Sequence, residues 1–75
     1  MAVEHLDTKG LNCPLPILRA KKAISALKAG DLLEVLATDP GAVKDFEAFS
    51  RSTGHELTEW SEENGVFRFV LRKSG

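Results

Sequence analysis

The sequence has very few of the residues that cross-link small domains or bind metals in them. It contains one cysteine, Cys13, and two histidines, His5 and His55, among 75 residues. One cysteine cannot form a disulfide within the chain or a Cys-x-x-Cys redox pair. These three residues also lie too far apart in sequence to predict a metal site. We therefore expect no metal or other cofactor, and a reducing, cytoplasmic setting for the free thiol.

An excess of charge of one sign and long apolar runs are also missing. Ten Lys and Arg stand against eleven Asp and Glu, for a net charge of −1. The overall field therefore gives no reason to expect direct nucleic-acid binding. No apolar run approaches the roughly 18 residues of a membrane span. Residues 1–7 lack the basic start and apolar stretch of a signal peptide, so we expect neither a membrane partner nor secretion.

The residues that are present predict a small α/β protein. Hydrophobic residues make up 43% of the chain, enough for a single domain over residues 1–75. Turn and helix-cap signals divide the chain into six elements. They are a strand at 3–7, a helix at 14–28 stopped by Gly30, a strand at 32–37, a helix opened by Asp39 and Pro40 and ended by Gly54, and two strands joined at Asn64-Gly65.

The pair Asn64-Gly65 is the strongest local signal, because both central residues of a type I′ hairpin turn need positive φ. A turn at this pair places Trp60 opposite Phe69. Leu57 then falls on the other face of the sheet unless a β-bulge intervenes.

The order of these elements predicts the architecture. A helix joins the first two strands, so they should run parallel, whereas the last two should form an antiparallel hairpin. The economical solution is a two-layer α/β sandwich, β-α-β-α-β-β, with both helices on one face of a mixed four-stranded sheet. The apolar strand at 32–37 should be central.

The segment 11–16, Leu-Asn-Cys-Pro-Leu-Pro, lies between the first strand and the first helix. Proline disfavours the helical conformation in the residue before it, so we expect Cys13 at the N-cap and Pro14 as the first helical residue. Pro16 falls in the same first turn, where backbone N–H groups have no helical partner. Cys13 should then face the positive end of the helix dipole, with the N–H of Leu15 as the nearest free donor. This environment favours the thiolate.

Two interpretations of Cys13 compete. An isolated cysteine is most often a small buried hydrophobe. A cysteine at a helix N-terminus, next to a loop that Gly10 keeps open, is more typical of a reactive thiol. We therefore interpret Cys13 as a nucleophile.

Helical spacing places two leucines and two cations on the solvent side of the first helix, near its cysteine end. Exposed leucines flanked by cations are suited to docking a protein partner. Cationic side chains there, including Lys21, are also typical of an ordinary solvated face. The docking patch comprises Leu15, Leu18, Arg19 and Lys22.

The cysteine segment resembles the signature of the TusA/SirA-like sulfurtransferase family. The resemblance begins with Asp7-x-x-Gly10-Leu11-x-Cys13-Pro14-x-Pro16 and extends over nearly the whole chain without insertions. The Cys-Pro-x-Pro element in this context is specific. Further matching residues are Lys22, the Gly30 turn, Asp39-Pro40, Asp45, Phe49, Gly54-His55-Glu56-Leu57 and Arg72-Lys73.

This resemblance implies the two-layer sandwich and a role for Cys13. The matching cysteine accepts sulfane sulfur as a persulfide and hands it to the next protein. Donors in the family include cysteine desulfurases and rhodanese-like proteins, and acceptors serve tRNA thiolation, sulfur oxidation or molybdenum-cofactor synthesis. Members that serve tRNA thiolation often carry an acidic residue between the two prolines, where this chain has Leu15. The pathway therefore stays open.

Other polar residues receive structural interpretations. Asp7 is expected to hold the cysteine loop by side-chain-to-backbone hydrogen bonds, and Asp39 to cap the second helix. His5 and His55 have no obvious carboxylate partner in sequence, so we expect ordinary strand-end histidines. The cations of the last strand, expected to serve solubility and to protect a sheet edge, are Arg68, Arg72 and Lys73.

The leading hypothesis is a cytoplasmic, monomeric sulfur-carrier sulfurtransferase that exchanges sulfur through Cys13 with a donor and an acceptor protein. The sulfur must leave to a partner, because the chain has no second cysteine. The alternatives are a non-catalytic interaction module that uses the docking patch alone, and a redox sensor in which Cys13 is oxidised. The residues expected to support Cys13 are Asp7, Gly10, Leu11, Pro14 and Pro16.

Overall fold

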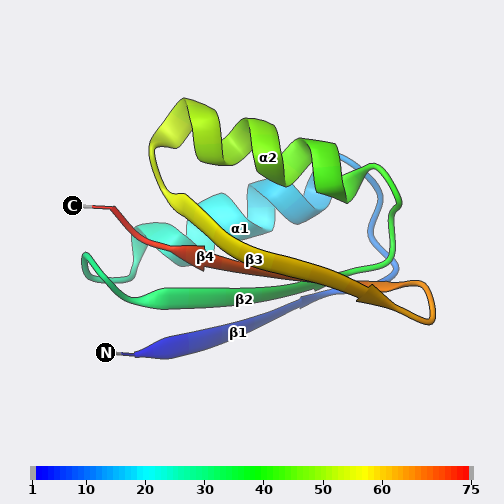
Figure 1. The fold of residues 1–75 in the computed structure, drawn as a ribbon, viewed down its shortest axis with the longest axis horizontal. Coiled ribbons are helices and arrows are strands. Elements are labelled where there is room, and N and C mark those ends of the chain that lie inside the picture. Colours follow the sequence, from blue (N-terminus) through cyan, green and yellow to red (C-terminus); the bar gives the residue numbers. More distant parts are fainter. Residues whose placement is uncertain (1, 75) are drawn as a thin grey trace.

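Two helices cover one face of a four-stranded sheet (Figure 1). The computed structural model describes residues 2–74. The element order and the mixed sheet confirm the predicted two-layer α/β sandwich. The elements are β1 (Val3–Thr8), α1 (Leu15–Ser25), β2 (Leu32–Ala37), α2 (Ala42–Thr53), β3 (Glu56–Glu63) and β4 (Val66–Arg72).

The strands lie in the order β1-β2-β4-β3. β1 and β2 are parallel, as expected of strands joined by a helix, and β4 is antiparallel to both of its neighbours. β4 is therefore an interior strand, and the prediction that its cations protect a sheet edge is wrong. Beyond β4, the Lys73 Nζ donates to the carbonyl oxygens of Ser25 (3.2 Å) and Leu27 (2.6 Å), at the C-terminal end of α1.

The β3–β4 hairpin follows the register that the turn residues predict. Asn64 and Gly65 have φ values of 53° and 82°, and Trp60 pairs with Phe69. A β-bulge between Leu57 and Glu59 shifts the register, so Leu57 joins the helix-facing side and packs against the core. The bulge supplies the irregularity that Leu57 requires.

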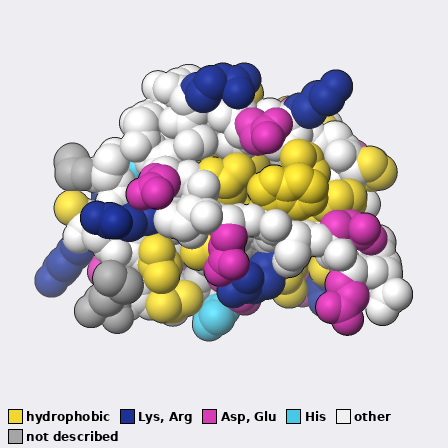
Figure 2. All heavy atoms as spheres, in the orientation of Figure 1, with side chains coloured by type: hydrophobic (Ala, Val, Ile, Leu, Met, Phe, Trp, Pro, Cys, Tyr) yellow, Lys and Arg dark blue, Asp and Glu magenta, His cyan; other side chains and the backbone are white. Residues whose placement is uncertain are grey.

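The core lies between the helices and the sheet. The Phe46 ring of α2 stacks on the Phe69 ring of β4, with 4.5 Å between ring centroids. The aromatic packing continues to the sheet edge at Trp60, which is 44% exposed. The ring centroids of Trp60 and Phe69 are 6.2 Å apart. Figure 2 shows hydrophobic side chains gathered on this face between α2 and β3, with charges of both signs around them. The buried core residues of the helices include Ala20, Ile24, Ala42 and Phe49.

The helix ends differ in detail from those the sequence predicts. α1 ends at Ser25, and Gly30 (φ 91°) lies in the turn before β2, not at the helix cap. α2 begins at Ala42, with Gly41 and not Asp39 at the N-cap. Gly54 does end α2 in the left-handed conformation, as predicted. No helix within residues 2–74 combines the length and apolarity needed to cross a bilayer.

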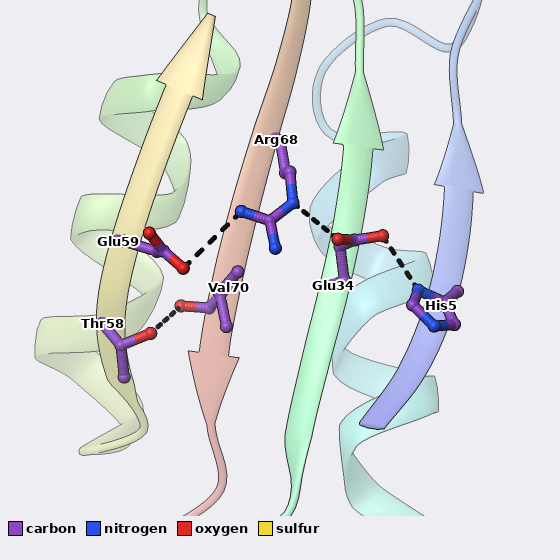
Figure 3. A network of polar contacts seen from close by, with 6 residues as sticks. All are labelled: His5, Glu34, Thr58, Glu59, Arg68 and Val70. Carbon is purple, nitrogen blue, oxygen red and sulfur yellow. Dashed lines mark hydrogen bonds and ion pairs between the residues drawn. The ribbon is translucent and has the colours of Figure 1, made fainter. Parts of the chain in front are cut away.

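A row of charged side chains, one from each strand, crosses the sheet face that carries no helix (Figure 3). His5 Nδ1 lies 2.8 Å from Glu34 Oε1, and Arg68 Nε donates to Glu34 Oε2 at 2.5 Å. Arg68 Nη1 lies 3.6 Å from Glu59 Oε1. The hydrogen bonds with His5 and then Arg68 lower the pKa of the Glu34 carboxyl. His5 thus has a carboxylate partner, which the sequence did not reveal.

Candidate active site at the cysteine loop

Cys13 lies in the loop between β1 and α1, and its side chain is exposed. The Cys13–Pro14 peptide bond is cis. Pro14 occupies the N-cap, with φ −98° and ψ 17°, and the helix begins at Leu15. The prediction that Cys13 is the N-cap and Pro14 the first helical residue is therefore wrong by one position. Pro16 does lie in the first turn, where it is buried.

The first backbone donor of α1 is not free to face the sulfur. The N–H of Leu15 donates to the carbonyl of Asn12 at 2.8 Å, so the donor predicted to face the thiol already has a partner. The helix start therefore offers an anionic sulfur less stabilisation than the sequence suggested.

Asp39 ties the cysteine loop to the loop before α2. One carboxylate oxygen, Oδ2, accepts the backbone N–H of Cys13 at 2.7 Å, and the other accepts the N–H of Gly41 at 3.0 Å. These two hydrogen bonds lower the pKa of the Asp39 carboxyl. Asp39 therefore joins its own loop to that of Cys13, 26 residues earlier in the chain. The prediction that Asp39 caps α2 is wrong, because Gly41 occupies the N-cap.

The loop before Cys13 is held by short-range and cross-loop hydrogen bonds. The carboxylate of Asp7 accepts the N–H of Lys9 at 2.9 Å, which is the type of contact expected of it. The N–H of Leu11 donates to the Thr8 carbonyl at 3.1 Å. Gly10 has a φ of 83°, a conformation that side chains rarely adopt, and its N–H donates to Thr38 Oγ1 at 2.9 Å.

Cys13 opens onto a shallow groove of about 350 Å³ between the two helices. The α1 side contributes Pro14 and Ile17, which are apolar. The α2 side adds one carboxylate, one hydroxyl and two apolar side chains. They are Asp45, Ser52, Ala48 and Phe49.

Within residues 2–74, the charged groups that act on the thiol are two carboxylates. Hydrogen bonding to Asp45 is the largest cause that raises the pKa of Cys13, followed by desolvation and by the negative charges of Asp45 and Asp39. The prediction that the site favours the thiolate is therefore wrong for the free protein. The reason is tertiary, because both carboxylates come from the second half of the fold.

The remaining predicted residues lie on the exposed side of α1 and at the start of β3. The predicted docking patch is exposed, with Leu15 at 42% and Leu18 at 54% of their maximum areas. Arg19 and Lys22 are exposed beside them on α1. His55 Nδ1 accepts the N–H of Ser74 at 3.1 Å, which ties the start of β3 to the end of the chain.

Asp45 was missed as a site residue by reasoning from the residues alone. Helical spacing does place Asp45, Ala48, Phe49 and Ser52 on one side of α2. Only the packing of α1 against α2 reveals that this side meets Cys13. Among residues 2–74, no group of His, Cys, Asp or Glu side chains is arranged to hold a metal ion.

Several known proteins resemble this chain in sequence or in fold. Residues 4–73 match the family model described as sulfurtransferase TusA. The chain is 59% identical over 71 residues to the sulfur carrier protein TusA of Allochromatium vinosum. The aligned region covers 95% of this chain and 93% of that protein. It is also 60% identical over 72 residues to a putative sulfur carrier protein of Neisseria meningitidis serogroup A, and the aligned region covers 96% of this chain and 97% of that protein. The crystal structure of a SirA-like protein from Desulfitobacterium hafniense matches with a TM-score of 0.83 and 27% identity, over 97% of this chain and 99% of that one.

Proposed function

Since the chain belongs to the TusA family of sulfurtransferases and is a sulfur carrier of a sulfur relay, we propose that Cys13 is the residue that carries the sulfur. The observation that supports this role is the exposed Cys13 thiol at the mouth of the interhelical groove. Cys13 is the only cysteine of the chain, so no other side chain can form a persulfide.

The proposed reaction consists of two displacements at sulfur. The Cys13 thiolate attacks the outer sulfur of a donor persulfide, a new S–S bond forms, and the donor cysteine leaves as a thiolate. An acceptor thiolate then attacks the outer sulfur of the Cys13 persulfide, and Cys13 leaves as a thiolate. Each step forms one S–S bond and breaks another, so it needs no external oxidant. In this scheme the protein acts as a sulfurtransferase.

The proposed partners follow from this chemistry. The donor is a persulfide-forming protein, a cysteine desulfurase or a rhodanese-like protein, and the acceptor is the next protein of the relay. Leu15, Leu18, Arg19 and Lys22 are proposed to dock them, because they form an exposed leucine and cation surface next to the cysteine loop. We propose a monomeric shuttle in the cytoplasm, whose reducing conditions keep the thiol free.

Intact-mass measurement tests the role of Cys13. Incubation with a cysteine desulfurase and cysteine should add one sulfur atom, which reductant removes, and Cys13→Ser should take up none. Leu18→Glu should slow loading from the protein donor but not from inorganic polysulfide. Val3→Glu serves as its control, since Val3 is 48% exposed but lies on β1. Sulfur uptake by Cys13→Ser equal to that of the wild type would refute the assignment.

A further inference from the structure

The α2 wall of the groove brings a carboxylate to the sulfur, which is unusual for a nucleophilic cysteine. Reactive cysteines are commonly activated by cations or by free helix N-terminal donors. Here Asp45 and Ser52 line the same groove as Cys13. The charged groups that act on the thiol are the carboxylates of Asp45 and Asp39.

These two carboxylates are not equivalent. Asp39 is occupied by the N–H groups of Cys13 and Gly41, so it has a structural role in joining the loops. None of the ion pairs formed within residues 2–74 involves Asp45. The Asp45 carboxylate therefore remains available to accept a hydrogen bond from sulfur.

The two half-reactions place opposite demands on the proton at this sulfur. Loading needs the Cys13 thiolate, because the thiolate is the nucleophile. Discharge needs a protonated persulfide, because an acceptor thiolate is repelled by an anionic persulfide. A neighbouring carboxylate disfavours both anions and so slows loading while it assists discharge.

On the basis of the proposed function, we propose that Asp45 is a positioning residue for sulfur transfer. Its carboxylate first accepts a hydrogen bond from the Cys13 thiol. After loading, it accepts a hydrogen bond from the terminal S–H of the Cys13 persulfide in the groove. During discharge the acceptor sulfur bonds to the outer sulfur, and the bond from that sulfur to Cys13 Sγ breaks. The proton stays on the transferred sulfur, and the Cys13 thiolate takes a new proton from water. The raised pKa of the thiol agrees with this geometry.

The first test compares the alkylation of Cys13 by iodoacetamide between about pH 6 and pH 10, where a thiol titrates. Asp45→Asn should move the profile to lower pH and speed alkylation near neutral pH by about threefold or more. Asp45→Glu, which keeps the charge, should stay closer to the wild type. Glu47→Gln is the matched control, because it removes the same charge from an exposed position of α2 outside the groove. An unchanged profile in folded Asp45→Asn would overturn the proposal.

The second test separates loading from discharge. Wild type and variants are loaded with inorganic polysulfide, and the persulfide is then discharged to glutathione, with both rates followed by intact mass. Asp45→Asn should load faster and discharge more slowly, whereas a merely structural loss would slow both steps. Equal changes in both rates would overturn the role of Asp45. Failure of the wild type to take up any sulfur would instead overturn the proposed function, while the alkylation profile would still report on Asp45.

Discussion

At the scale of single residues, the site depends on carboxylates that are distant from Cys13 in sequence. Asp39 fixes the backbone of Cys13 from 26 residues away, and Asp45 acts on its sulfur. The sequence identified Cys13 correctly as an exposed thiol in a loop, because local proline and glycine signals place it there. It could not predict the electrostatics of the thiol, because those depend on how α2 packs against α1.

Removal of the Asp39 carboxylate should loosen the cysteine loop. In Asp39→Ala the N–H of Cys13 loses its 2.7 Å acceptor, so its amide hydrogen should exchange with solvent faster than in the wild type. Asp7→Ala is the control, because the Asp7 carboxylate contacts the backbone N–H and the ammonium group of Lys9, whereas the Cys13 N–H donates to Asp39. Equal protection of the Cys13 amide in wild type and Asp39→Ala, measured by NMR, would contradict this assignment.

At the scale of elements, local signals were reliable where the structure depends on neighbouring residues. The hairpin register around Trp60 could be predicted because turn chemistry determines it, whereas the bulge entered only as the condition for Leu57 to face the core. The start of α2 could not, because Asp39 has two competing uses and the tie to Cys13 prevails over capping. The interior position of β4 also depends on long-range pairing with β2.

The hairpin turn provides a test at this scale. Gly65 has a φ of 82°, so Gly65→Ala should lower the free energy of unfolding by about 1 kcal/mol. Gly41→Ala should cost less, because Gly41 has a φ of −71° and its added Cβ would meet Asp39 only at an ordinary 3.5 Å. Urea denaturation of both variants measures the difference, and equal losses would argue against the turn conformation.

At the scale of the whole molecule, one charged row links all four strands. Glu34 is its centre, because it bonds His5 on one side and Arg68 on the other. A row of this kind joins the two edge strands, β1 and β3, to the two interior strands through side chains as well as through the backbone (Figure 3).

This row should make stability depend on pH. The folded state lowers the pKa of Glu34 below its ordinary value of 4.5, so the contribution is present above that pH and is lost as pH falls through the lowered value. Glu34→Gln should therefore cost about 1 kcal/mol near pH 7, and the difference from wild type should shrink in acid. Glu63→Gln, at an exposed site on β3, is the control. Thermal unfolding across acidic and neutral pH measures the gap, and a constant gap would contradict the assignment.

The parallel pairing of β1 with β2 also determines how this carrier can be attached to other proteins. Val3, Leu32 and Arg72 lie in register at one end of the sheet, and the strand ends that lead toward Cys13 lie at the other. The chain therefore enters β1 and leaves β4 at the end of the sheet away from the Cys13 loop (Figure 1). A polypeptide linked before β1 or after β4 would therefore join the fold at the end of the sheet opposite the cysteine loop.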